Sequence, residues 1–156
     1  MKLLTLAAAS LAMAIAAPAL AQNVEKVGPA GGRILTAAKV KAGATTVYLS
    51  GNLASPATPG GSDYGDTKTQ TISTLKKIKE LLAAHGMTMK DIVRMDAYLV
   101  AAPGMDGKMD FAGFNAGFAE FFNNAENPTT TTRTTMQISA LAGPQFLVEL
   151  TVIAAK

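Results

Sequence analysis

The sequence of 156 residues contains no cysteine, no tryptophan and a single histidine, His85. Without cysteine the fold can have neither a disulfide framework nor a thiolate metal site. A single histidine also argues against a histidine-based zinc site and against a Ser-His-Asp triad. We therefore expect no metal site and no chemistry that depends on a pair of histidines.

The chain also lacks a large excess of either acidic or basic residues. The formal net charge is only +3, and the basic residues are scattered except for Lys76, Lys77 and Lys79. These three lysines fall on one expected helix, where such a cluster is typical of a solvated face. We therefore expect no nucleic-acid partner.

A long hydrophobic run occurs at the start of the chain. A basic beginning and an apolar run over residues 3–17 precede Ala19-Leu20-Ala21, which fits a small-x-small cleavage site. The run is too short for a good membrane span, and nothing else in the sequence resembles one. We predict a cleaved signal peptide over residues 1–21, a periplasmic protein, and one compact domain over residues 22–156.

Hydrophobic periodicity and turn residues predict seven elements in the mature chain. They are strands over residues 33–40 and 45–50, a helix over 67–85, a strand over 92–100, a helix over 110–124, and strands over 128–141 and 146–154. Short glycine-containing breaks predict that the first two strands form one hairpin and the last two another. At the start of the first helix, Thr67 and Gln70 fit a capping box. Two helices on one face of a single sheet give a two-layer α+β domain, whose uncovered face favours an oligomer.

Each of the last two strands carries one ionisable residue, Arg133 or Glu149. Alternation along a strand puts Arg133, Thr135 and Gln137 on one face. A charge in so apolar a region is costly to bury alone, so the pair indicates a solvated face, a structural ion pair or a functional site. In the predicted hairpin the two residues lie roughly 13 Å apart along the strands. A site that uses both therefore needs a ligand between them or contributions from two subunits.

Several segments together carry a family resemblance over about residues 27–155. They are Tyr48-Leu-Ser-Gly51, Asp91-Ile-Val, Tyr98-Leu-Val, Asp110-Phe-Ala followed by Asn115, Arg133 after a proline-containing loop, and Val148-Glu149-Leu. In this combination the chain resembles the RidA/YjgF (reactive intermediate deaminase) family. The resemblance implies a chorismate-mutase-like fold with one mixed sheet, a homotrimer, and ligand clefts between subunits.

The resemblance also implies a reaction and the residues for it. Arg133 matches the carboxylate-binding arginine of the family and Glu149 its conserved glutamate. The expected substrate-binding residues are Ser50, Gly51, Asn115 and Thr135, the last at a position where cysteine is frequent. The implied reaction is the hydrolysis of reactive 2-enamine or 2-imine acids to 2-keto acids and ammonia. It needs no metal or organic cofactor, because an iminium carbon is already electrophilic.

Two other functions stay open. One is a non-catalytic trimer that binds small carboxylates through Arg133. The other is the ribonuclease activity by which some relatives are labelled, although scattered basic residues and the lack of a histidine pair argue against it. The chain also differs from many active members in having no clear counterpart of a tyrosine before the first strand and a longer loop over residues 101–108.

Overall fold

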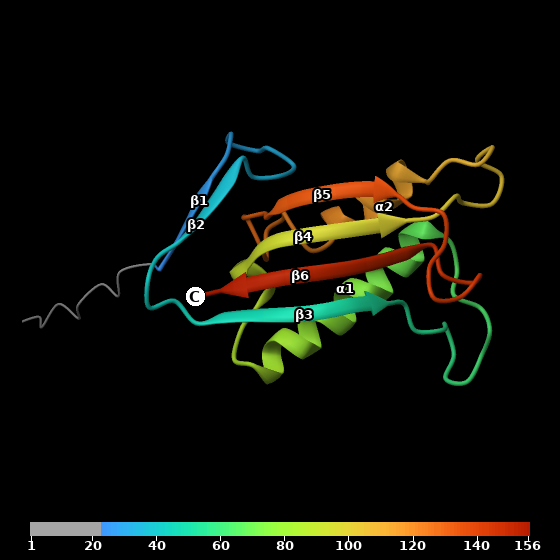
Figure 1. Cartoon of the computed structure of the whole chain (residues 1–156), viewed down its shortest axis with the longest axis horizontal. Coiled ribbons are helices and arrows are strands. Elements are labelled where there is room, and N and C mark those ends of the chain that lie inside the picture. The colour runs from blue at the N-terminus through green and yellow to red at the C-terminus, as the bar shows by residue number, and fades with distance from the viewer. Residues whose placement is uncertain (1–22) are drawn as a thin grey trace, which may run out of the picture.

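A computed structural model of the protein describes residues 23–156, so the predicted signal peptide lies outside the described part. The body is a four-stranded sheet in the order β3-β6-β4-β5 with both α-helices on one face (Figure 1). A separate two-stranded sheet, β1-β2, lies beyond one end of the body. The elements are β1 (Val24–Val27), β2 (Ala37–Val40), β3 (Thr46–Leu53), α1 (Thr67–Ala84), the 3₁₀ helix η1 (Met89–Asp91), β4 (Ile92–Leu99), α2 (Phe111–Ala119), β5 (Thr132–Gln137) and β6 (Val148–Ala155).

The central strand β6 gives the sheet its two faces. Its buried side chains point toward the helices, whereas Glu149, Thr151 and Ile153 are half-buried on the other, open face. The core between sheet and helices is made by Leu75, Ile78, Leu82, Met95, Leu99, Phe114, Phe118, Phe122, Leu150 and Val152, among others. A mixed sheet with two helices on one face confirms the predicted two-layer α+β fold.

The N-cap of helix α1 lies one residue earlier than predicted. Asp66 is the N-cap, and its side chain accepts a hydrogen bond from the Thr69 amide at 2.8 Å. The predicted capping box of Thr67 and Gln70 is wrong, because the Gln70 side chain turns to the loop before β6. There it donates to Gln145 O at 2.9 Å and accepts from the Leu147 amide at 2.8 Å.

Helix α2 begins where predicted and ends earlier. The Asp110 side chain caps it by accepting from the Gly113 amide at 2.8 Å. The helix ends at Ala119, about a turn before the predicted end, because Asn124 organises a turn in place of further helix. The Asn124 Oδ1 atom accepts hydrogen bonds from the amides of Glu126 and Asn127.

The predicted C-terminal hairpin is wrong. Strand β4 lies between the two strands, parallel to β5 and antiparallel to β6. The connecting segment passes over the end of β4, where Ile138 donates to Leu99 O at 2.7 Å and Val100 donates to Leu147 O at 3.1 Å. The chain reaches β5 through α2, so β4-α2-β5 is a crossover unit whose strands are parallel.

The predicted N-terminal hairpin is also wrong. Strand β2 pairs with β1, a short strand that the sequence reasoning missed, while β3 pairs with β6 in the main sheet. The side chain of Lys26 on β1 ties this small sheet to the body. Its ammonium group donates to Lys90 O at 2.7 Å and to Thr130 O at 2.9 Å.

The loop after β4 is compact and attached to β5. Gln137 accepts a hydrogen bond from the Met109 amide at 2.8 Å and donates one to Gly107 O at 2.7 Å.

Within residues 23–156, no helix combines the length and apolar character needed to cross a membrane.

Candidate functional site

The predicted site residues fall into two groups on opposite faces of the sheet. Arg133 is the register partner of Met95, which is fully buried under the helices, so both side chains lie on the helix face. Glu149 is the partner of Tyr98 on β4, and both are half-buried on the open face. Within one chain Arg133 and Glu149 are therefore separated by the thickness of the sheet.

The Arg133 guanidinium is enclosed by α2. Its Cζ atom lies 4.6 Å from the ring centre of Phe118, 4.9 Å from that of Phe114 and 5.9 Å from that of Phe111. Rings at such distances attract a cation through their negative faces. Asn115, one turn after Phe111, accepts a hydrogen bond from Nη2 of Arg133 at 2.9 Å. The rings and the amide together hold the guanidinium in one orientation.

Burial is the main reason why the pKa of Arg133 falls to about 10, and the positive charge of Arg33 is the second. At neutral pH the group is still charged. Its Nη1 atom and the Oγ1 atom of Thr135 are buried without a hydrogen-bond partner among residues 23–156. Thr135 follows Arg133 on the same face of β5. Donors left free in this way are suited to a carboxylate, which accepts several hydrogen bonds.

Two adjoining grooves run along the outer side of α2, with volumes of about 700 and 360 Å³. Asn115 and Arg33 line both of them. The larger is completed mainly by apolar side chains, including Met105 and Met109 from the loop held by Gln137. The grooves thus lead to the amide that contacts Arg133.

On the open face, Glu149 lies against a bulge in β3. The register between β3 and β6 shifts between Leu49 and Asn52, so Ser50 and Gly51 form the bulge. An added Cβ at Gly51 would lie 2.8 Å from the carboxyl carbon of Glu149. The glycine therefore permits the carboxylate to pack on the backbone, and Ser50, Gly51 and Glu149 form a second cluster.

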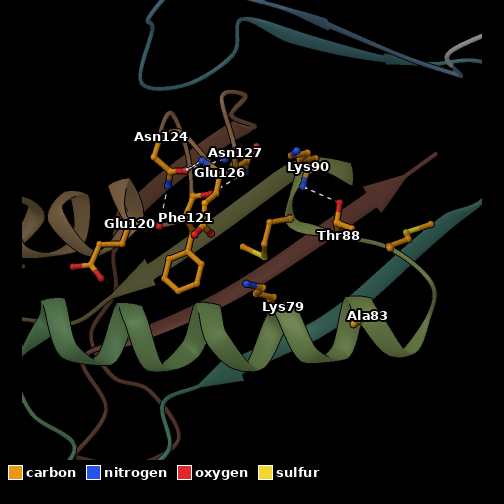
Figure 2. Close-up of a pocket in the computed structure, with 11 residues that line it drawn as sticks. Lys79, Ala83, Thr88, Lys90, Glu120, Phe121, Asn124, Glu126 and Asn127 are labelled. Carbon is orange, nitrogen blue, oxygen red and sulfur yellow. Dashed lines mark hydrogen bonds between the residues drawn. The ribbon is translucent and has the colours of Figure 1, made fainter.

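A further cavity of about 250 Å³ contains none of the predicted site residues. It lies between α1, η1 and the turn after α2, with the Phe121 ring directed toward α1 (Figure 2). Two lysines and two glutamates line it, namely Lys79, Lys90, Glu120 and Glu126. None of the buried polar atoms that lack a partner within residues 23–156 belongs to this lining, and we place the candidate site at Arg133. No group of three or more His, Cys, Asp or Glu side chains in residues 23–156 is placed to hold a metal.

Sequence reasoning missed Arg33. We expected it to begin a strand, whereas it lies in the loop between β1 and β2, over the grooves on α2. The glycines at 31 and 32 indicate a turn, but nothing in the sequence indicates which surface that turn approaches. Helical periodicity likewise gives no indication that Asn115 contacts Arg133.

The fold and the site define a two-layer α+β domain that holds an arginine beside an anion-compatible groove. Comparison with known proteins identifies its family. Residues 36–156 match the family model described as Endoribonuclease L-PSP. A RutC family protein from Sulfurisphaera tokodaii is 33% identical over 113 residues, which are 71% of this chain and 80% of that protein. The chain belongs to this family, the RidA/YjgF family, as the sequence motifs predict.

Solved structures agree with the fold. The Rid family protein YyfB from Yersinia pestis superimposes with a TM-score of 0.68 at 24% identity, covering 86% of this chain and all of that one. TdcF from Escherichia coli, solved with bound serine, gives a TM-score of 0.59 at 26% identity, covering 75% of this chain and 84% of TdcF. Because YyfB is only 24% identical to this chain, its similarity supports the fold alone.

Proposed function

We propose that this protein is a hydrolytic deaminase of 2-imino acids whose site forms between two copies of the chain in a homotrimer. The observation that carries the proposal is the Arg133 guanidinium, oriented by Asn115 and with Nη1 free of partners among the described residues. A planar guanidinium binds a carboxylate through two parallel hydrogen bonds, which suits the carboxylate of an imino acid. Bound serine in TdcF, a relative with the same fold, supports a small amino-acid-like ligand.

The two clusters suggest how the site is assembled. Arg133 and Thr135 lie on the helix face of β5, which is an edge strand of the sheet, and Asn115 of α2 is bonded to Arg133 there. Ser50, Gly51 and Glu149 lie on the open face, which none of the helices and strands within residues 23–156 covers in Figure 1. A neighbouring copy that presents its open face to this edge brings the two clusters together, and a cyclic trimer repeats that contact three times.

The chemistry follows from the roles of the two clusters. Arg133 of one copy holds the substrate carboxylate, and Glu149 of the other accepts a proton from water as its oxygen attacks C2 of the iminium group. The resulting carbinolamine receives that proton on nitrogen. Glu149 then removes the proton of the C2 hydroxyl, the C2–O bond becomes a carbonyl, and the C2–N bond breaks with its electron pair leaving on ammonia, which can take up the proton held by Glu149. The products are a 2-keto acid and ammonia, which accounts for all the atoms of the imino acid and one water molecule.

We also propose that the protein is exported to the periplasm, which depends on residues 1–21 alone.

The alternative function is that of a non-catalytic carboxylate-binding protein. If the open face does not contact a second copy, Arg133 and Glu149 cannot act on one ligand. The separation of the two residues within one chain would then favour the carboxylate-binding protein. The first test measures ammonia release from imines that an amino-acid oxidase generates in situ. We expect acceleration by the protein, its loss in Arg133→Ala, and its loss with retained 2-keto acid binding in Glu149→Gln.

A mixing experiment tests the assembly. Arg133→Ala and Glu149→Gln chains are co-expressed with different tags, and the mixed oligomers are purified through both tags. If two copies share each site, one of the three interfaces in every mixed trimer has both residues intact, so about one third of full activity reappears. If one chain supplied both residues, the mixture would stay as inactive as its parents, and that result would contradict the shared site.

A further inference from the structure

The loop that carries Arg33 is fixed against the body of the protein. The buried Thr130 side chain donates to Arg33 O at 2.8 Å, and Leu35 donates to Thr131 O at 3.0 Å. Asn123, at the end of the neighbouring turn, donates to Gly32 O at 3.1 Å. These bonds come from the segment that leads into β5, the strand of Arg133. The position of Arg33 relative to Arg133 is thus set by the fold.

Arg33 contributes a cation to the two grooves that border Asn115, the hydrogen-bond partner of Arg133. Asn115 lines both grooves with Arg33 and binds the guanidinium of Arg133. The described residues that line the two grooves include no aspartate or glutamate. None of the ion pairs within residues 23–156 involves Arg33.

Two positive charges near one another without a carboxylate raise the free energy of the empty site. The effect reaches Arg133, because the charge of Arg33 helps to lower its pKa. One bound carboxylate compensates one of the two cations. A ligand with a second anionic group compensates both. Apart from Arg33 and Asn115, the side chains that line the larger groove are apolar, so Arg33 is the charged partner that the groove offers to that group.

We infer that the ligand of this site carries two acidic groups, with its 2-carboxylate on Arg133 and a second, side-chain carboxylate on Arg33. This inference rests on the proposed function of the same site and narrows its substrates to dicarboxylic 2-imino acids, which give dicarboxylic 2-keto acids. Arg33 is then the residue that selects the substrate, while Arg133 is the anchor that every 2-imino acid uses.

The test compares two 2-keto acids of equal length, 2-oxoglutarate and 2-oxopentanoate, which differ in a terminal carboxylate. Their binding to the purified protein is measured by isothermal titration at a fixed salt concentration, because charge contacts weaken with salt. We expect 2-oxoglutarate to bind roughly tenfold more tightly, the ratio that one added charge contact of moderate strength produces. Arg33→Gln should bring the ratio close to one, because it weakens the binding of 2-oxoglutarate much more than that of 2-oxopentanoate.

The charge-matched control is Lys41→Gln, which removes one positive charge from the turn between β2 and β3 and should preserve the ratio. Binding of both ligands with equal strength, or a ratio that survives Arg33→Gln, would overturn the inference and leave the carboxylate site intact. Failure of both ligands to bind would overturn the carboxylate site itself, and the inference with it. Ammonia release from oxidase-generated imines of aspartate and norvaline should show the same preference.

Discussion

The carboxylate of Glu149 packs directly on the backbone of Gly51, so closely that a methyl group at position 51 would overlap it. Residue 51 belongs to the β3 bulge, and the contact joins an edge strand to the central strand of the sheet. The glycine therefore determines where the carboxylate can lie. This contact can be tested separately from any activity.

We expect Gly51→Ala to lower the free energy of unfolding by about 1–2 kcal/mol, since it overfills a packed contact. The destabilisation should largely disappear in a Glu149→Ala background, where the shorter side chain leaves room for the methyl group. Urea unfolding of the four proteins, at one protein concentration, gives the coupling energy. Additive effects would show that the methyl group clashes with something other than Glu149.

Asn115→Asp should separate stability from ligand binding. The new carboxylate lies within hydrogen-bond reach of Arg133, so it should pair with the guanidinium, stabilise the fold and compete with the ligand. We expect 2-keto acid binding to weaken by about tenfold or more. Asn115→Ala removes the amide without adding a charge and should weaken binding by only about two- to threefold. Equal losses in both variants would contradict an ion pair at Arg133.

Two glutamines test what burial adds to a similar set of hydrogen bonds. Gln70 is 1% exposed and bonds to Gly65, Gln145 and Leu147, whereas the exposed Gln137 bonds to Gly107 and Met109. Gln70→Leu leaves buried backbone groups without partners and should cost about 3 kcal/mol, against about 1 kcal/mol for Gln137→Leu. Chemical unfolding measures both losses. Similar losses would mean that water reaches the backbone around Gln70.

Hydrogen exchange should distinguish the same two variants by location. In Gln137→Leu we expect faster exchange confined to the loop before α2, because the two hydrogen bonds of Gln137 attach that loop to β5. Gln70→Leu should instead speed exchange at the start of β6. Uniform acceleration over the whole domain would indicate global destabilisation in place of local release.

Lys26 should make stability depend on alkaline pH. Burial lowers its pKa from 10.5 to about 8, partly opposed by the charge of Asp91. Between about pH 8 and 10.5 the unfolded chain binds a proton that the folded chain has lost, so Lys26 makes stability rise with pH in this window. In Lys26→Met this contribution disappears. The difference between the two unfolding free energies, followed from pH 7 to 10.5, measures it.

Lys39→Met is the matched control for Lys26, because Lys39 lies on β2 of the same small sheet and its side chain is 67% exposed. Its difference from the unmodified protein should stay level across the window. A level difference for Lys26→Met as well would show that the amine keeps the pKa of a solvated lysine and is not held at the carbonyls of Lys90 and Thr130.

The sequence is informative about elements and much less so about their partners. The spacing of Ile78 and Leu82, or of Phe114 and Phe118, predicts helices because burial of one helix face repeats every three to four residues. Strand pairing leaves no comparable periodic pattern in the sequence. The break between Gln137 and Val148 fits a hairpin turn as well as a passage over the end of β4, and only the tertiary packing of α2 decides between them.

The sequence supplies candidate residues for a site and not their arrangement in space. Alternation correctly places Arg133 with Thr135, and Glu149 opposite the buried row of β6. Because the predicted pairing of these strands was wrong, the sequence could not show that Arg133 and Glu149 lie on opposite faces of one sheet. Arg33 was inaccessible for a related reason, since loop contacts between residues about a hundred positions apart leave no periodic pattern.

The central place of β6 has a consequence for how the protein is made. Thr46 at the start of β3 pairs with Ala155 at the end of β6, and β3 has no other neighbour in its sheet. On the ribosome, β3, α1 and β4 therefore emerge long before the strand that joins them. Folding of the sheet must wait for β6, a high contact order that predicts slow folding. Chains interrupted before residue 148 would expose the facing edges of β3 and β4, and we expect them to aggregate.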